Sequence, residues 1–192
     1  MLETLNNIDT SVFLFLNHLN LPFLDPFMLA ISYNKVLMGV IIIGICLLGF
    51  KYFKKQFFMA FFFCLIAFGL SDSISTRIFK DNTKRLRPCH NPKLKDKVYL
   101  AGQKCWGGKY GFVSSHASNT FAISMFFWLL FRKRNKYIIG LFAYACLVSY
   151  SRIYLARHYP GDIIGGALLG ALLGYFSFFL YQKTKLKLKS EI

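Results

Sequence analysis

The sequence SRIYLARHYPGD, residues 151–162, connects two long apolar segments and concentrates several ionisable side chains in one short stretch. Arg152 ends the first apolar segment, Pro160 suits the first turn of a helix, and Asp162 follows His158 by four positions. At this spacing the carboxylate can accept the ring N–H of His158, which fixes the tautomer and leaves the other ring nitrogen free to attack. A single His–Asp pair near a helix start is more often structural than catalytic, so the interpretation depends on the rest of the chain.

Two further fragments lie at the ends of apolar segments. KDNTKRLRP, residues 80–88, supplies Lys80 and Arg87, and VSSH, residues 113–116, places Ser114 and Ser115 before an apolar segment with His116 in its first turn. Serine is a favoured N-cap, and the N–H groups of a helix start bind phosphate well. Alone, each fragment has a simpler interpretation, as cations that contact phospholipid or as a capped helix. Three such fragments on one membrane face predict a site that binds and attacks a phosphate on a lipid.

The composition is that of a membrane protein. The chain has 192 residues, a mean hydropathy of +0.43, 55% hydrophobic residues and 22 phenylalanines, which leaves too little polar surface for a soluble domain. The 24 basic and 8 acidic residues give a formal charge of +16, but the basic residues form short blocks between apolar segments. This distribution indicates topology signals and phospholipid contacts, and it argues against a nucleic-acid partner.

Five apolar segments approach the length of about 20 residues that a membrane-spanning helix needs. They are Val36–Phe53, Phe57–Phe79, His116–Phe131, Tyr137–Leu155 and Asp162–Tyr181. Because a backbone in lipid must satisfy its own hydrogen bonds, we predict an all-α, polytopic membrane helix bundle with five or six transmembrane helices. Residues 1–192 are expected to form a single domain, with interfacial helices over 1–32, a transmembrane core over 33–181 and a basic cytoplasmic tail over 182–192.

The first 20 residues predict an amphipathic helix at the membrane interface. Apolar side chains recur there at spacings of three and four, at Leu2, Leu5, Ile8, Val12, Leu16 and Leu19. The segment holds Glu3 and Asp9 and no Lys or Arg, which is not the opening of a cleavable signal peptide. A membrane span over residues 11–32 is the less favoured alternative, because it would have to carry several polar side chains.

Counting the segments places the three fragments on one face of the membrane. Basic blocks at 51–55, at 132–136 and in the C-terminal tail lie on the other face, which the positive-inside rule assigns to the cytoplasm. The loop from Lys80 to Val113 opposes this assignment with nine Lys or Arg residues, but several of these have an anionic ligand to meet. The fragments are therefore expected to lie on the outer face of the membrane.

Small residues and cysteines give two further expectations. Gly166, Gly170 and Gly174 recur at intervals of four and favour tight helix packing inside a monomer over a homodimer contact. Cys89 and Cys105 both lie in the long outer loop, where an oxidising compartment permits a disulfide. A disulfide or two free thiols is favoured over a zinc site with His90, because the spacing is not that of a structural finger.

The three fragments resemble the type 2 phosphatidic acid phosphatase family, which is related to vanadium haloperoxidases. The family pattern is K-x6-RP, then PSGH, then SR-x5-H-x3-D. The first and third parts match completely at Lys80–Pro88 and Ser151–Asp162. The middle part departs from the pattern, because Val113 replaces proline and Ser115 replaces glycine. The resemblance covers about residues 57–181.

The resemblance implies a metal-independent lipid phosphate phosphatase that works through a phosphohistidine, with its site facing the periplasm from a bacterial inner membrane. It implies that His158 is the nucleophile, that Asp162 orients it, and that His116 is the general acid. The implied phosphate ligands are Lys80, Arg87, Ser114 and Arg152, with Ser115 beside them, and no metal or other cofactor is required. The substrate is expected to be a membrane lipid phosphate, with undecaprenyl diphosphate favoured and lipid A or phosphatidylglycerol phosphate as alternatives.

Two other interpretations fit the chain less well. Vanadate-dependent haloperoxidase chemistry gains nothing from five membrane spans. A non-enzymatic lipid-binding membrane protein explains the spans and the cations, but it does not explain two histidines and a carboxylate on the same face.

Overall fold

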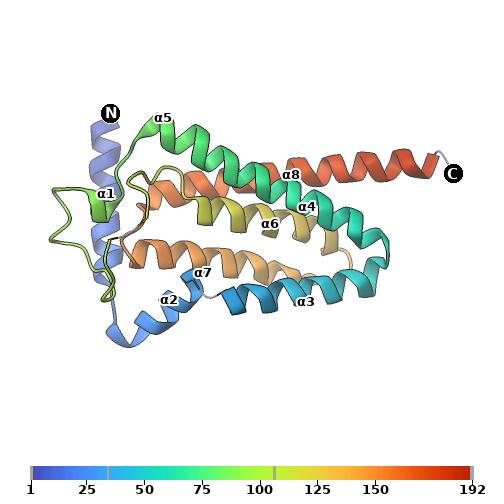
Figure 1. Ribbon diagram of the computed structural model, residues 1–192, viewed down its shortest axis with the longest axis horizontal. Helices are drawn as coiled ribbons and strands as arrows, with labels where there is room; N and C mark the ends of the chain where they lie inside the picture. The colour runs from blue at the N-terminus through green and yellow to red at the C-terminus, as the bar shows by residue number, and fades with distance from the viewer. Residues whose placement is uncertain (1, 34, 106, 191–192) are drawn as a thin grey trace.

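Long helices that run side by side form the body of the protein (Figure 1). The structure is a computed structural model that describes residues 2–33, 35–105 and 107–190, and those residues form helices and loops without a β-strand. The helices of the body are α3 (Lys35–Phe53), α4 (Gln56–Ser73), α6 (Ser115–Phe131), α7 (Gly140–Tyr154) and α8 (Pro160–Ser190). The predicted all-α membrane bundle is confirmed.

Four stretches are long and apolar enough to cross a membrane: Val36–Phe53, Gln56–Thr83, Lys136–Tyr154 and Pro160–Leu188. They correspond to four of the five predicted spans. The fifth, α6, has 17 residues, the lower end of the range for a spanning helix, and it is the most enclosed helix of the body. The outer helices turn large apolar side chains outward, such as Val40 and Leu47 on α3 and Leu168 and Leu172 on α8, as contact with lipid requires.

The N-terminal helices lie against one end of the body. Helix α1 (Leu2–His18) crosses this end, and after the short 3-10 turn η1 (Pro22–Leu24) the chain enters α2 (Asp25–Tyr33) at an angle of 88° (Figure 1). Residues 11–32 therefore do not form one straight spanning helix. The outward side of α1 carries the exposed side chains of Leu5, Ile8, Val12 and Phe15, and exposed Leu19 follows the helix directly. This is the stripe expected of a helix at a lipid interface.

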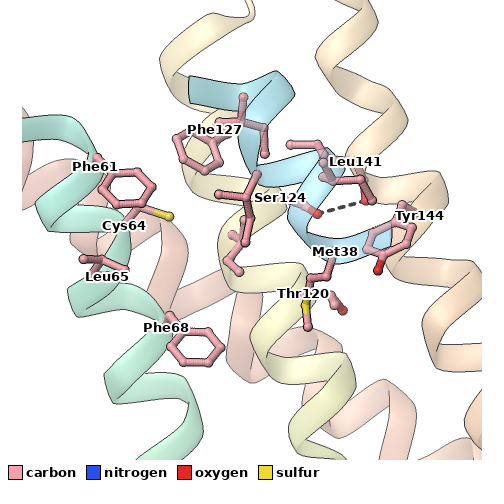
Figure 2. A pocket seen from close by; sticks show the side chains of 14 residues that line it. Met38, Phe61, Cys64, Leu65, Phe68, Thr120, Ser124, Phe127, Leu141 and Tyr144 are labelled. Carbon is pink, nitrogen blue, oxygen red and sulfur yellow. Dashed lines mark hydrogen bonds between the residues drawn. The ribbon is translucent and has the colours of Figure 1, made fainter. Parts of the chain in front are cut away.

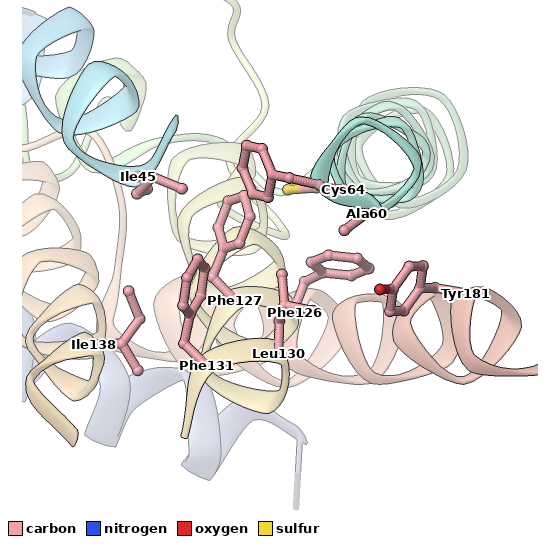
Figure 3. Packing of buried hydrophobic residues seen from close by; sticks show 10 residues of the cluster. Ile45, Ala60, Cys64, Phe126, Phe127, Leu130, Phe131, Ile138 and Tyr181 are labelled. Carbon is pink, nitrogen blue, oxygen red and sulfur yellow. The ribbon is translucent and has the colours of Figure 1, made fainter. Parts of the chain in front are cut away.

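Aromatic packing fills the half of the body away from α1. Phe57 and Ala60 of α4, Phe127 and Phe131 of α6 and Tyr181 of α8 meet in one buried cluster, with Ile45 of α3 at its edge (Figure 3). Lipid tails are as apolar as these side chains, so close van der Waals packing, rather than escape from water, holds helices together here.

Helices α6 and α8 make the closest pair in the body. Gly166, Gly170 and Gly174 of α8 lie against the backbone of α6 near Ser114, Ser118 and Ala122, so close that a Cβ atom would not fit at any of the three. The glycines thus pack within the monomer, which is the interpretation that the sequence favoured. This contact sets the relative position of the two helices that carry His116 and Asp162.

Helix α8 is much longer than one span. It has 31 residues, about 46 Å at 1.5 Å per residue, and its C-terminal end extends past the other helices (Figure 1). Residues 182–190 of the expected tail therefore continue this helix, and residues 191–192 lie outside the described residues.

Short elements complete the chain at the α1 end. The π-helical segment η2 (Ile74–Lys80) and α5 (Asp81–Thr83) extend α4, and η3 (Pro88–His90) opens the long loop. At the opposite end η4 (Lys136–Ile139) leads into α7. All three sequence fragments consequently lie at the α1 end of the body.

Candidate active site

The turn between α7 and α8 holds the His158–Asp162 pair. The backbone N–H groups of Arg157 and His158 both donate to the carbonyl oxygen of Arg152, at 2.8 and 3.2 Å, and fold the turn back over the end of α7. Helix α8 then begins at Pro160. His158 Nδ1 lies 3.4 Å from Asp162 Oδ2, at the long end of hydrogen-bonding distance, and both side chains are buried.

The surroundings of His158 favour a neutral imidazole. Burial lowers the pKa of His158 well below its usual value, and the positive charges of Arg87, Arg152 and Lys80 lower it further. With Nδ1 facing Asp162, the tautomer that carries its proton on Nδ1 leaves the Nε2 lone pair available. A neutral imidazole with a fixed orientation is what nucleophilic attack on phosphorus needs.

Ser114 fixes the start of α6 against the start of α8. It is the N-cap of α6, and its hydroxyl accepts the N–H of Ala117 at 3.5 Å. Its own N–H donates to the carbonyl oxygen of Asp162 at 3.0 Å. His116 follows in the first turn of α6 and is exposed, and the charges of Arg152, His158, Lys80 and Arg87 act on it. The structure thus brings the two histidines and the three cations to one place.

Lys80 reaches the site from the end of η2. Its Nζ donates to Ser115 Oγ at 2.7 Å, and the Ser75 hydroxyl donates to the same oxygen at 2.9 Å. π-Helical turns are rare and often lie at functional sites. This one places Lys80 at the candidate site. One turn before Ser75, two further hydrogen bonds join α4 to α6. The hydroxyls of Ser71 and Ser118 lie 2.5 Å apart, and the Asn119 amide donates to Asp72 Oδ1 at 3.0 Å.

Arg87 is held by a pairing of two loop segments. The N–H of Arg87 donates to the Lys109 carbonyl at 2.9 Å, and the N–H of Gly111 donates to the Arg85 carbonyl at 2.8 Å. The Arg87 side chain adds a bond from Nε to the Tyr110 carbonyl at 3.2 Å. Burial, followed by the charges of Arg152 and Arg157, lowers the pKa of Arg87 to about 10, so it stays charged at neutral pH.

Arg152 is buried more deeply than the sequence indicated. It was expected as a cation near the interface, yet its side chain donates to the Ser32 hydroxyl and lies over the Tyr33 ring, 5.0 Å from the centroid. Helix α2 covers this arginine, a long-range contact that segment counting does not contain.

Sequence reasoning missed Arg85 and Asp9. Arg85 lies inside KDNTKRLRP at a position that the family pattern leaves open, and Asp9 was noted only as a charge in the N-terminal segment. In the structure Arg85 donates to Asp162 Oδ1 at 2.8 Å and to Asp9 Oδ2 at 2.6 Å. The available signal was the rarity of acidic residues, because only eight stand against 24 basic ones.

Gly111 lies so close to the His158–Asp162 pair that it provides a test of this geometry. A Cβ on Gly111 would stand 2.8 Å from Asp162 Oδ2, 3.3 Å from Arg87 Cγ and 3.5 Å from His158 Nδ1. Gly111→Ala is therefore expected to displace the carboxylate and to lower kcat by about 100-fold, the effect of a misplacement of about 1 Å. Steady-state kinetics in detergent check this, with Gly108→Ala as the control because nothing lies within 4 Å of that position. Equal kcat values for the two variants would contradict the geometry.

Cys89 and Cys105 form a disulfide in the structure, with Cα atoms 5.7 Å apart. Ligand atoms of the two cysteines and of His90 lie within 4.8 Å of one another, the grouping that a zinc site would use. Because both sulfur atoms are bonded to each other, they are not thiolates that could hold the metal. The bridge instead ties η3 to the far part of the loop.

Known proteins are similar to this chain over the region that contains the candidate site. A family model described as the PAP2 superfamily matches residues 57–186. A "Lipid A 4'-phosphatase" of Bacteroides thetaiotaomicron is 34% identical over 100% of this chain and 84% of its own length. The protein of the same name from Porphyromonas gingivalis is 33% identical over 96% of this chain and 78% of its own length. An "Undecaprenyl-diphosphatase" of Sulfolobus acidocaldarius is 39% identical, but over only 35% of this chain and 32% of its own length.

The fold has a counterpart among solved structures. The crystal structure of a transmembrane PAP2 type phosphatidylglycerolphosphate phosphatase from Bacillus subtilis superposes with a TM-score of 0.67 at 23% identity, over 96% of this chain and 87% of the other. The family match begins in α4 and ends in α8, so it contains every residue from Lys80 to Asp162 that converges at the α1 end of the body. The resemblance seen in the three fragments is confirmed, and the chain belongs to the PAP2 superfamily.

Proposed function

We propose that this membrane phosphatase hydrolyses a phosphomonoester of lipid A and so removes a phosphate group from it. The observation that carries the proposal is the similarity to two lipid A 4'-phosphatases over nearly the whole chain. Undecaprenyl diphosphate, which the sequence alone favoured, has weaker support because the undecaprenyl-diphosphatase match covers about a third of the chain. Lipid A, an alternative substrate at the level of sequence, is therefore preferred to undecaprenyl diphosphate.

In the proposed mechanism, cations hold the phosphate while His158 attacks it. Lys80, Arg87 and Arg152 bind the non-bridging oxygens, and Ser115 and the N-terminus of α6 at Ser114 add hydrogen-bond donors. The Nε2 lone pair of His158 forms a bond to phosphorus as the ester P–O bond breaks. Asp162 accepts the Nδ1 proton in a hydrogen bond and stabilises the positive charge that develops on the ring.

His116 completes both halves of the proposed reaction. In the first half it donates a proton to the sugar oxygen that leaves phosphorus. In the second half the neutral His116 accepts a proton from water, and the resulting hydroxide attacks the phosphohistidine. The P–N bond breaks, inorganic phosphate leaves, and His158 regains its free nitrogen.

An apolar cavity beside the site offers a place for an acyl chain of the substrate. It has a volume of about 330 Å³ and lies between α3, α4, α6 and α7, where Met38, Phe61, Phe68, Phe127 and Tyr144 line it (Figure 2). Thr120, one turn after His116 on α6, lies on its wall. We infer that an acyl chain of a lipid whose phosphate is bound at His158 enters this cavity.

The apolar helices and the bacterial relatives indicate a bacterial membrane protein. We further infer that the site opens to the periplasm, because the basic blocks at 51–55 and 132–136 lie at the opposite end of the body and mark the cytoplasmic side. A monomer stays our prediction for the oligomeric state.

A comparison of substrates tests the proposed function. Purified protein in detergent receives lipid A, undecaprenyl diphosphate and phosphatidylglycerol phosphate in separate assays of phosphate release. We expect kcat/KM for lipid A to exceed the other two by about 10-fold or more, a difference of roughly 1.4 kcal/mol in transition-state binding. Mass spectrometry of the lipid A product identifies which sugar has lost its phosphate. A higher kcat/KM for undecaprenyl diphosphate would overturn the assignment.

A further inference from the structure

We propose that Asp9 of the N-terminal helix α1 positions the His158–Asp162 pair through Arg85, so that α1 contributes to turnover at a site built by α6 and α8. The proposal rests on the roles proposed above for His158 and Asp162. It assigns Asp9 and Arg85 as positioning residues that do not themselves touch the substrate.

The two carboxylate oxygens of Asp162 face different partners. Oδ2 faces His158 Nδ1 at 3.4 Å and accepts the N–H of Tyr159 at 3.1 Å. Oδ1 accepts Arg85 Nη1 at 2.8 Å. The Asp162 side chain is fully buried, and a buried carboxylate stays ionised only when a cation and hydrogen bonds compensate its charge. Arg85 therefore sets both the charge of Asp162 and the direction in which its second oxygen points.

Arg85 is fixed from its other side by α1. Its Nη2 donates to Asp9 Oδ2 at 2.6 Å and to Asn6 Oδ1 at 2.9 Å. Its guanidinium also lies over the Tyr159 ring, 4.1 Å from the centroid. Both terminal nitrogens are thus engaged by side chains of the protein, which distinguishes Arg85 from a phosphate ligand. Without Asp9 the guanidinium loses the partner that holds its outer edge.

Asp9 makes a second contact with the same region. Its Oδ1 accepts the N–H of Gly161 at 2.8 Å, in the first turn of α8. A carboxylate at a helix N-terminus is favourable, because the N–H groups there lack partners within the helix. Asp9 consequently holds both Arg85 and the helix start that carries Asp162. Phe13 of α1 adds an edge-on contact with the Tyr159 ring.

Several charged or titratable groups surround Asp162 and bear on its protonation. Arg85 and Arg87 approach from the long loop, Lys80 from η2, Asp9 from α1, and His158 and Tyr159 from the preceding turn. Removal of Arg85 takes away the cation in direct contact. Asp162 then takes up a proton more readily, so the acidic limb of the kcat profile is expected to move to higher pH.

The test compares Asp9→Asn, Arg85→Gln and the double variant in full-length protein. Each is assayed with whichever of the three lipid phosphates the wild type hydrolyses fastest, so a failure of the lipid A assignment does not affect the comparison. We expect Asp9→Asn to lower kcat by about 10-fold while KM changes little, because a displaced group costs rate rather than affinity. Asparagine at position 9 keeps an oxygen that can accept the Gly161 N–H and loses the oxygen that faces Arg85. The double variant should therefore be no slower than Arg85→Gln.

Asp25→Asn is the matched control. Asp25 also anchors the N-terminal region, by accepting the hydroxyls of Tyr99 at 2.6 Å and Tyr154 at 2.5 Å, but these contacts do not lead to Asp162. It is expected to lower thermal stability without changing kcat or the pH limb. Arg85→Lys keeps the charge and replaces Arg85→Gln if that variant does not fold. Wild-type kcat and pH profile in both the Asp9 and Arg85 variants, or multiplied losses in the double variant, would refute the proposal.

Discussion

Replacing His158 by alanine is expected to lower turnover by about 10⁴-fold or more, since its imidazole is the proposed nucleophile that forms the phosphohistidine. His158 is the buried imidazole that faces Asp162 and is surrounded by Lys80, Arg87 and Arg152. Alanine leaves these cations in place, so His158→Ala should still bind lipid phosphate. The measurement pairs phosphate release with acid-quenched trapping of the phosphoenzyme, which wild type should form and His158→Ala should not.

A second histidine variant tests whether loss of any imidazole, rather than of the one at His158, lowers turnover. His18 of α1 bonds the Lys97 carbonyl at 2.8 Å, a contact with the long loop that involves none of the proposed site residues. His18→Ala is expected to retain wild-type turnover and phosphoenzyme. Trapped phosphate in His158→Ala at the wild-type level would exclude this nucleophile and would require a different catalytic interpretation of the site.

The parts of the site that lie close together in sequence could be predicted from it. His158 and Asp162 are four residues apart and joined by one turn, so their contact depends on local geometry alone. The placing of this pair on the same face as Lys80 and His116 followed from the order of the apolar segments, because the two segments between His116 and His158 return the chain to the face that it left. Nothing more than hydropathy and spacing was needed for either step.

The parts that depend on the N-terminal helices could not be predicted. The Arg85–Asp9 pair joins positions 76 residues apart, and no hydropathy pattern fixes where an interfacial helix lies. Asn17 of α1 is fully buried, and its side-chain amide donates to the carbonyl oxygens of Tyr99, Ile153 and Tyr154. Such contacts satisfy backbone groups at the ends of distant segments, so they become visible only after the fold is known.

Gly170→Ala is expected to destabilise the bundle by roughly 2–3 kcal/mol and to abolish activity with it, because the added methyl group has no space. A Cβ there would fall against the carbonyl oxygen of Ser118, well inside van der Waals contact, and within 2.8 Å of the Ser118 carbonyl carbon and 3.0 Å of the Ala122 nitrogen. These are backbone atoms of α6, which cannot move aside as a flexible side chain could. Helix α8 must therefore shift away from α6, and Asp162 must shift with it.

The sign of this effect separates packing from helix propensity. Alanine is favoured over glycine inside a helix by about 1 kcal/mol, so an uncrowded glycine should give a neutral or more stable variant. Gly69 of α4 meets that condition, because nothing lies within 4 Å of the position that an added methyl group would take, and Gly69→Ala is the matched control. Thermal unfolding in detergent compares the two variants with wild type. If Gly170→Ala is as stable as Gly69→Ala, α6 and α8 do not approach as closely as these distances indicate. The hydrogen bond from the Ser114 N–H to the Asp162 carbonyl depends on that approach, so the same result would also contradict this bond.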